Sequence, residues 1–388
     1  VSFSSLIAKL GTEATEQEIK SLEFMYQTLR GSTGINETMD LSTSVLLRRV
    51  RDFNFIRMMG MSGLAALAEV PNVMFENGIR HFLTNVPAIP SMIGRLKADG
   101  ELRNALVREV EIGNGLGADV FTGSAIARFD DTSDDISRLS QTHGKLDEGL
   151  AHGRRMVSLM SGLTPVTVFL QRLHQYNTVT KFYKELVTKG NLGVYHPAKL
   201  KQLNLDEDML KRVQTEMKKN GKLKGKRLET INAKDWTDRE AADAFEYALF
   251  LDTTQVVQLT NASSINPFFN SVVGKSAFQF WSFPVAATEQ QYARQTARLA
   301  EGDLRPLAMI SGSLGVATLS YIARAAINAN GKDDPDKYFS EKMEIGNLAR
   351  GGASGIGFLG VGSFAFNYGG VDPASLVQNP TIQLGSGI

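Results

Sequence analysis

Apolar residues recur every three or four positions along most of the chain, which is the spacing of one face of an α-helix. A first predicted helix begins at the capping box of Thr15 and Glu18 and ends near Gly31. A second is predicted from about residue 40 to residue 60. Its apolar stripe consists of Leu46, Val50, Phe53 and Ile56, and its arginines are expected on a solvated face: Arg48, Arg49, Arg51 and Arg57.

Further helices are predicted over 178–190 and 206–220, and a capping box of Thr237 and Glu240 opens a third. Residues 60–95 are apolar but interrupted by prolines, so short buried helices are favoured there over an interfacial segment. No series of alternating strands with hairpin turns is present. The predicted fold class is therefore all-α, an elongated multi-helix assembly subunit with a glycine-rich C-terminal tail.

Composition divides the chain into three predicted regions. Residues 1–128 form an N-terminal helical region, and residues 129–235 form a middle helical region that ends in a basic loop. Residues 236–388 contain a helical hairpin, an apolar helix and the glycine-rich tail.

The stretch 274–330 joins an aromatic cluster, a polar helix and an apolar helix. Gly302 and Asp303 break and re-cap the chain, and Pro306 is tolerated in the first turn that follows. Residues 306–323 carry no charge. An uncharged segment of this length is about long enough to span a bilayer. The aromatic residues are Phe278, Phe280, Trp281 and Phe283, and the small residues in the apolar helix include Ser311, Gly312, Ser313 and Gly315.

Two interpretations of this stretch remain open. In one, the aromatic side chains lie at a membrane interface and the helix 306–323 enters a bilayer. In the other, the aromatics fill a helical core and the small residues allow close helix packing in a protein oligomer, which Arg324 and the Ser and Thr content favour. Residues 351–371 are uncharged and rich in glycine, so we expect them to be ordered by other subunits or lipid, or to stay flexible.

Charge and cysteine content narrow the function classes. The net charge of +1 gives no global attraction to nucleic acid or anionic lipid, so any such affinity must come from a local patch. The absence of cysteine excludes disulfides, thiol catalysis and Cys-ligated metals. The chain begins at Val1 without a signal-peptide pattern, and we expect it to be an internal piece of a larger polypeptide.

The sequence contains no complete catalytic or cofactor-binding motif. The five histidines (His81, His143, His152, His174 and His196) show no metal-ligand spacing. Gly274-Lys275-Ser276 resembles the end of a phosphate loop, but Phe269 occupies the position that requires glycine. GIGFLG at 355–360 lacks the strand–turn–helix context of a dinucleotide site. No catalytic residue, metal or cofactor is predicted.

The most basic segment is a candidate contact with nucleic-acid phosphates. Flexible cations beside glycine neutralise a phosphate backbone without reading bases, although a solvated inter-domain loop explains the same pattern. The six residues concerned are Lys218, Lys219, Lys222, Lys224, Lys226 and Arg227.

The stretch FQFWSFPVAATEQQYARQTARLAEGD, the apolar helix after it, DDPDKYF and the glycine-rich tail together resemble the C-terminal region of large internal virion proteins of short-tailed phages. RRVRDFNFIRMMGMSGLAALAEVPNV is similar to the helical region of the same family. These proteins are also called ejection or internal core proteins. The resemblance carries over no catalytic residue, and no segment matches the murein-cleaving domain that some relatives possess.

The resemblance implies a structural protein inside the capsid at the portal vertex, which leaves through the tail and helps to form a channel for genome delivery across the host envelope. Its implied partners are other internal core proteins, the portal, genomic DNA, the host inner membrane and further copies of the chain. A membrane-inserting pore or transport component unrelated to phage is the alternative. A hydrolase with a site built from scattered residues is a third hypothesis, and it requires a pocket where ionisable groups converge.

Overall fold

The computed structural model describes residues 41–59, 62–92, 105–114, 145–225, 227–257 and 288–356, together with positions 19, 23, 274 and 276. Helix accounts for 82% of these residues, which confirms the prediction of a mostly helical chain. Three predicted features lie outside the described residues: most of the first helix, the aromatic cluster at 278–283, and the part of the glycine-rich tail after residue 356.

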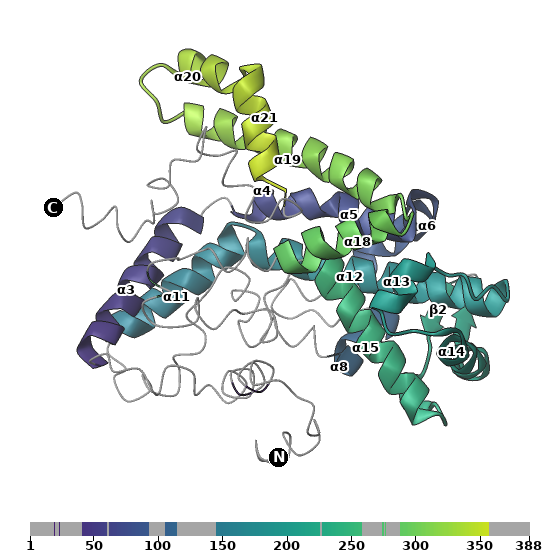
Figure 1. Ribbon diagram of the computed structural model, residues 1–388. Coiled ribbons are helices and arrows are strands. Elements are labelled where there is room, and N and C mark those ends of the chain that lie inside the picture. Colours follow the sequence, from purple (N-terminus) through teal and green to yellow (C-terminus); the bar gives the residue numbers. More distant parts are fainter. Residues whose placement is uncertain are drawn as a thin grey trace.

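The N-terminal part consists of one long helix followed by short ones (Figure 1). Pro71 and Pro87 each lie in the first turn of a short helical element, and Gly78, with φ of 88°, separates the helix that contains Pro71 from the next one. The elements are α3 (Leu41–Met58), α4 (Ser62–Ala66), the 3₁₀ helix η2 (Leu67–Glu69), α5 (Val70–Asn77), α6 (Ile79–Asn85), the 3₁₀ helix η3 (Val86–Ala88), α7 (Ile89–Met92) and α8 (Ala105–Asn114).

The middle part contains the longest buried helix and one β-hairpin. Its elements are α11 (Lys145–Met160), α12 (Leu163–Phe182), the π-helix η9 (Tyr183–Thr188), α13 (Pro197–Gln202), α14 (Glu207–Asn220), β1 (Lys222–Lys224), β2 (Arg227–Thr230), the 3₁₀ helix η10 (Ala233–Asp235) and α15 (Arg239–Val256). The Asp206 carboxylate accepts from Met209 N at 2.7 Å and caps α14. The cap of α15 is Asp238 and not Thr237, because the Thr237 hydroxyl donates to Glu216 instead.

The C-terminal part contains the apolar helix α19 (Arg305–Ala329), which lies across α5 (Figure 1). The predicted break before it is confirmed, since Gly302 has φ of 90° and Asp303 Oδ1 accepts from Arg305 N at 3.1 Å. The remaining elements are the π-helix η11 (Thr288–Ala293), α18 (Arg294–Ala300), α20 (Pro335–Lys342) and α21 (Ile345–Ser354).

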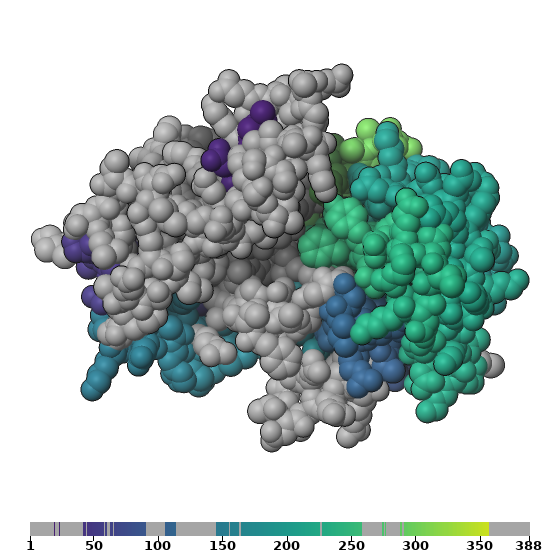
Figure 2. All heavy atoms as spheres, turned by 90° about the horizontal axis from the view of Figure 1, so that it is seen from below, coloured from purple at the N-terminus to yellow at the C-terminus, as the bar shows by residue number. Residues whose placement is uncertain are grey.

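The main hydrophobic core surrounds α12 and draws on all three predicted regions, from Val73 to Val257. The Phe182 ring meets the rings of Tyr195 and Phe245 edge-on, with centroids 5.5 and 5.2 Å away. In the view of Figure 2, α8 (blue) lies against the green surface of the α15 region. Each fully buried Leu or Phe side chain of this core contributes about 1.5–3 kcal/mol.

Besides the cap of α15, two predictions about local structure are wrong. The apolar stripe of α3 does not form the buried face, because Leu46 and Phe53 are exposed while Arg51 is fully buried and donates to Ser276 Oγ. The helix instead turns charges toward α11, where Asp147 pairs with both Arg48 and Arg49. The basic loop is a β-hairpin, since Gly225, with φ of 63°, supplies the turn that joins β1 to β2.

Candidate functional site

Helix α19 combines length, apolar composition and an uncovered face. It spans 25 residues. Within the described part of the chain it is the one helix long and apolar enough to cross a membrane, judged by length and composition alone. Only 28% of its most apolar 18-residue stretch is buried, whereas the core helix of a soluble protein is mostly buried.

The face of α19 that packs on the protein is built from small residues. Positions 306, 309, 313, 317 and 320 are buried and follow each other at intervals of three or four, so they form one stripe. Ser313 Oγ donates to Asn72 Oδ1 at 2.9 Å. A Cβ atom on Gly312 would lie 2.7 Å from Pro71 Cβ and 2.8 Å from Phe75 Cε2, so the helices touch only because this residue is glycine. Gly312, predicted as a contact with lipid or another subunit, packs instead on α5 of its own chain.

Large apolar side chains and small residues occupy the other side of α19 and the turn before it. Leu304, Leu307 and Leu319 are 69%, 51% and 65% exposed. Ser311 and Gly315, two more of the predicted contact residues, are also exposed, and no atom lies within 4 Å of a Cβ built on Gly315. We call Leu304, Leu307 and Leu319 the exposed leucines.

Helix α21 covers part of the C-terminal half of α19. Gly351 and Gly352 are buried, and a Cβ on either one would overlap with Tyr321 or Thr318. The first glycines of the predicted tail are therefore helical and packed against α19 of the same chain.

Buried charged residues hold α18 and the start of α19 on α5. Arg298 donates from its two terminal nitrogens to Glu76 Oε2 and Oε1 at 2.9 and 3.1 Å. The same guanidinium contacts Asp303 Oδ2 at 2.6 and 3.0 Å. Because Asp303 Oδ1 also accepts from Arg305 N in the first turn of α19, the ion pairs connect α5, α18 and α19.

The cluster continues to α13, α12 and α15. Lys199 Nζ lies between Glu76 and Asp252, with the Asp252 Oδ1 atom 2.5 Å away. His174 Nε2 contacts Asp252 Oδ2 at 2.8 Å, and the Thr178 hydroxyl donates to the same oxygen at 3.0 Å. Arg298, Glu76, Lys199, Asp252 and His174 together form what we call the buried ionic cluster.

Tyr195 closes one side of the buried ionic cluster. Its hydroxyl donates to Asn77 Oδ1 at 2.5 Å. Its ring faces Lys181 Nζ and Lys199 Nζ, which lie 4.0 and 4.3 Å from the centroid. Burial lowers the pKa of Lys181 to about 7, with the charges of Arg305 and Lys199 acting in the same direction.

The electrostatics favour charged carboxylates in this cluster. Burial raises the pKa of Glu76, but the charges of Lys199 and Arg298 outweigh it and bring the pKa to about 2. Burial likewise opposes ionisation of Asp252, and the positive charge of Lys199 holds the pKa of that carboxyl well below its usual range. Both groups are therefore ionised at neutral pH and paired with cations.

Ionisable groups do converge here, as the hydrolase hypothesis requires. However, the side chains of Glu76, Lys199 and Asp252 are 0%, 1% and 1% exposed, and they bind each other. They cannot touch a substrate in this conformation, and their arrangement suits a structural clamp. No group of three or more His, Asp or Glu side chains among the described residues could hold a metal ion.

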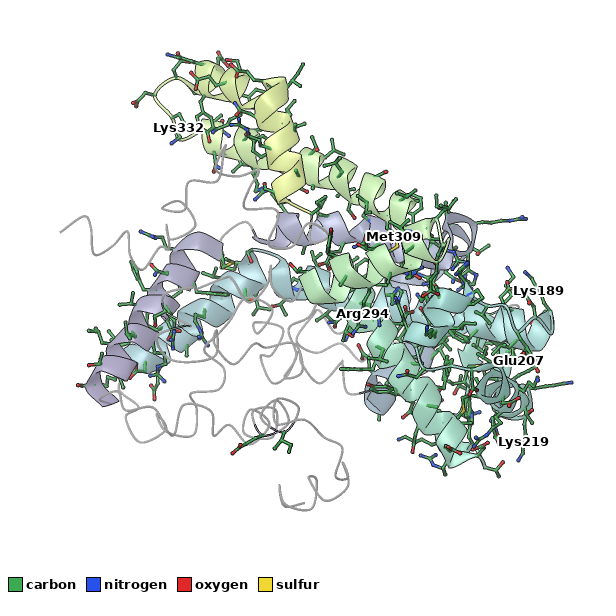
Figure 3. All side chains as sticks on the ribbon, in the orientation of Figure 1. Lys189, Glu207, Lys219, Arg294, Met309 and Lys332 are labelled. Atoms are coloured by element: carbon green, nitrogen blue, oxygen red, sulfur yellow. The ribbon has the colours of Figure 1, made fainter. Side chains whose placement is uncertain are left out.

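The described members of the predicted nucleic-acid set lie at the end of α14 and on the β1–β2 hairpin, where Arg227 begins β2. Lys218 and Lys219 lie in the last turn of α14, where positive charge stabilises the helix end. Lys222 and Lys224 are exposed on β1, and Lys226 lies outside the described residues. Figure 3 places Lys219, with Lys189 and Glu207, on the opposite side of the molecule from Lys332 beyond the end of α19.

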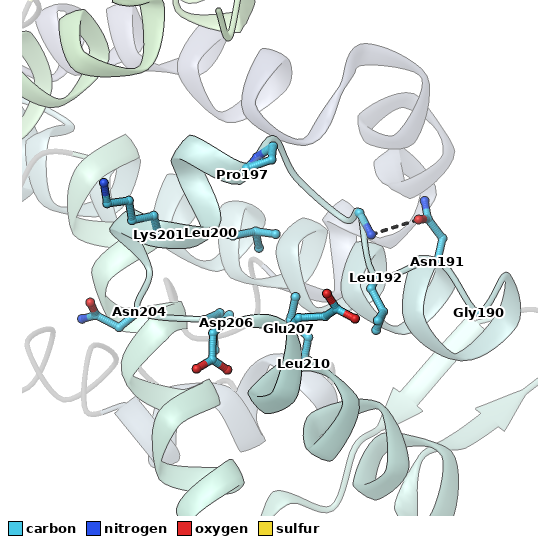
Figure 4. Close-up of a pocket in the computed structure, with 12 residues that line it drawn as sticks. Gly190, Asn191, Leu192, Pro197, Leu200, Lys201, Asn204, Asp206, Glu207 and Leu210 are labelled. Carbon is cyan, nitrogen blue, oxygen red and sulfur yellow. Dashed lines mark hydrogen bonds between the residues drawn. The ribbon is translucent and has the colours of Figure 1, made fainter. Parts of the chain in front are cut away.

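A surface pocket of about 960 Å³ lies between α13 and the start of α14 (Figure 4). Leu192, Leu200 and Leu210 supply apolar lining, and charges of both signs come from Lys201, Asp206 and Glu207. Asp206 is already used as a helix cap. The mixed charge gives this pocket no preference for an anion or a cation.

The sequence contained only a weak signal for the buried ionic cluster. Glu76 and Lys199 are 123 positions apart, and Glu76 and Arg298 are 222 apart, so no local spacing connects them. The one available sign was a lone charge in an apolar stretch, such as Asp252 directly after ALFL.

No protein-family model matches the chain, and no curated protein or solved structure matches it either. The resemblance to internal virion proteins therefore stays a hypothesis based on sequence.

Proposed function

We propose that this chain is an assembly subunit that uses the exposed leucines beside and along α19 to bind other chains or lipid. On the sequence resemblance, the assembly is the internal core of a short-tailed phage virion, and the chain is ejected to help form a channel for genome delivery across the host envelope. The chain itself carries out no reaction in this proposal. DNA is a non-specific partner through exposed cations of the β1–β2 hairpin.

The observation that carries this proposal is the uncovered apolar side of α19. A solvent-exposed leucine costs little when it stands alone, but three within one turn-and-helix unit expose apolar area that a partner would bury. Burial of one such side chain contributes about 1.5–3 kcal/mol.

Small residues on the opposite side of α19 support the same role. Apart from Met309, they hold the helix against α5 with small side chains, while the buried ionic cluster fixes its start. The exposed leucines are thus presented on a supported helix, which lowers the entropy cost of binding.

Sedimentation and liposome flotation test the interaction. Leu307→Asp combined with Leu319→Asp should abolish both self-association and liposome binding, because an aspartate cannot be buried cheaply. Leu159→Asp is the matched control, since Leu159 is 54% exposed on a different helix, α11. Equal loss in both variants, or no association of the unaltered chain, would overturn the proposal.

The phage-specific part needs a separate test. Purified particles treated with nuclease and protease should retain the chain inside the capsid, as detected by mass spectrometry. Its absence from intact particles, combined with liposome leakage caused by the purified chain, would favour the pore unrelated to phage.

A further inference from the structure

A second pocket lies between the β1–β2 hairpin, α6 and the junction of α12 with the π-helix η9. Its volume is about 560 Å³, within the range of roughly 300–1,000 Å³ that small-ligand pockets occupy. It is separate from the exposed leucines and from the pocket beside α14. We call it the hairpin pocket.

Charge distinguishes the hairpin pocket. Among the residues that the structure describes, its lining includes Lys184 and Arg227 but no carboxylate. The whole chain carries 42 basic and 41 acidic residues, and the pocket beside α14 contains Asp206 and Glu207 beside Lys201. A site with cations and without acids in a balanced chain favours an anionic ligand.

Polar groups on the inner wall are fixed by hydrogen bonds. Asn85 Nδ2 donates to Asn177 Oδ1 at 2.8 Å and to Thr180 Oγ1 at 3.0 Å. His81 Nε2 lies 3.1 Å from Asn177 O and 3.2 Å from Asn85 Nδ2, so it can donate to the carbonyl in one tautomer and accept from the amide in the other. Burial lowers the pKa of His81 to about 4, and Lys181 and Lys184 lower it further against the effect of the hydrogen bond to Asn177 O. The ring is therefore neutral at pH 7.

Aromatic and aliphatic side chains supply the rest of the wall. Tyr176 and Tyr183 come from α12 and η9, and Leu223 and Leu228 come from the two strands. Burial raises the pKa of Tyr176, while the positive charge of Arg227 opposes this rise, so the cation acts on the phenol. Apolar wall and positive charge thus belong to the same pocket.

Two backbone irregularities, a π-helix and a β-bulge, lie at or beside residues that line the hairpin pocket. Tyr183, Lys184 and Thr188 come from a π-helix, an uncommon element that is often found at functional sites. A β-bulge between Lys222 and Leu223 shifts the strand register directly beside the lining residue Leu223. A Cβ at Gly221 would lie 2.5 Å from Tyr183 Cε2, so the hairpin packs tightly on the tyrosine.

We propose that the hairpin pocket binds a phosphorylated nucleoside, either as a free nucleotide or as one unit of a single-stranded nucleic acid. Lys184 and Arg227 would hold the phosphate, because guanidinium and ammonium groups make strong charge-assisted hydrogen bonds to phosphate oxygens. The tyrosines and leucines would contact the base, and fixed polar groups near His81 would meet its edge or the sugar. An inorganic phosphate would leave the apolar wall unused.

This inference is independent of the α19 proposal. Binding of a nucleotide needs neither lipid nor a second chain, and the exposed leucines line no part of the hairpin pocket. The full chain with Leu307→Asp and Leu319→Asp should therefore bind the nucleotide unchanged.

Calorimetry with three probes tests the proposal: adenosine monophosphate, inorganic phosphate and an eight-nucleotide oligothymidine. We expect binding of the monophosphate or the oligothymidine at millimolar concentrations or below, and much weaker binding of phosphate. Binding of the monophosphate identifies a free nucleotide as sufficient, and binding of the oligothymidine alone identifies a strand. The proposal is overturned if neither the monophosphate nor the oligothymidine binds, or if inorganic phosphate binds as tightly as they do.

Charge variants separate the pocket from the rest of the protein surface. Lys184→Gln with Arg227→Gln should weaken binding at least about tenfold, since two phosphate contacts are lost. The control removes two exposed charges that lie neither in the pocket nor on the β1–β2 hairpin, Lys332→Gln with Lys337→Gln, and should change binding less than about twofold. Equal weakening by both pairs would show a diffuse basic surface and would refute the pocket.

Photocrosslinking with 8-azidoadenosine monophosphate provides a readout that does not depend on altered chains. The labelled peptides should come from 81–88, 176–188 or 223–228. Labelling confined to other peptides would contradict the proposal even if the nucleotide binds.

Discussion

Glu76 connects α5 to α13 and to the C-terminal helix α18. It is fully buried, and it accepts from Arg298 of α18 and contacts Lys199 of α13. A buried ion pair gives little net stability compared with a well-packed apolar pair, because desolvation of both charges offsets their attraction. Removal of one partner is far more damaging, since it leaves the other charge buried without compensation.

Glu76→Gln should therefore destabilise the protein by about 3–5 kcal/mol, because Arg298 and Lys199 lose their shared counter-ion. Urea unfolding followed by circular dichroism measures the change. Glu207→Gln is the control, because the Glu207 side chain is 71% exposed and its pair with Lys211 should contribute less than about 1 kcal/mol. A loss for Glu76→Gln no larger than for the control would show that the cluster does not hold the fold together.

At the scale of elements, α19 has two glycines three positions apart that face different surroundings. Gly312 lies against α5, and Gly315 points into open space. Glycine in a helix interior costs roughly 0.5–1 kcal/mol relative to alanine. It is therefore unfavourable at a helix position unless a close contact leaves no room for a Cβ atom. Packing on α5 explains the glycine at 312, and the close approach of a partner, as proposed above, would explain the glycine at 315.

The two glycines give a matched pair of variants. Gly312→Ala should destabilise the chain by about 1–3 kcal/mol, since its methyl would meet Pro71 and Phe75 at less than 3 Å. Gly315→Ala should stabilise the isolated chain by up to about 1 kcal/mol through higher helix propensity. Both values come from chemical unfolding. The packing of α19 on α5 would be refuted if Gly312→Ala raised stability as Gly315→Ala does.

Element boundaries were largely predictable, while the faces of some elements were not. Asp206, Gly302 and Asp303 are local signals, and each marks a helix end as expected. The face of α3 was assigned wrongly, because its arginines pair with Asp147 about a hundred residues away, and sequence spacing does not reveal such partners. The β1–β2 hairpin was missed because three- and four-residue strands rich in lysine give almost no periodic signal.

On the scale of the whole molecule, the hydrophobic core and the buried ionic cluster both connect the predicted regions. The hydrophobic core surrounds α12 and includes residues from α5, α8 and α15. The buried ionic cluster adds α13 and α18, so helices from distant parts of the sequence share one set of charges. A change in the ionisation of this cluster should thus affect the described fold as a unit and not one helix alone.

Acid unfolding tests this connection. The pKa of Glu76 falls from 4.5 to about 2 on folding, so the folded state favours the ionised carboxylate. A depressed carboxyl pKa contributes stability above the unfolded value, and that contribution is lost as the pH falls through 4.5 toward 2. The loss attributable to Glu76 should be on the order of 3 kcal/mol, with a further loss in the same direction from Asp252.

The comparison of the unaltered chain with Glu76→Gln isolates this contribution from other carboxylates. The free energies of unfolding of the two proteins should differ most at pH 7 and converge as the pH approaches 2, because protonation of Glu76 then removes the same charge as the substitution. If α18 is released together with the core, circular dichroism and the fluorescence of Trp236, which packs on Phe245 of the core, should report one coincident transition. A constant difference between the two proteins from pH 7 to pH 2 would mean that Glu76 does not titrate as the buried cluster requires.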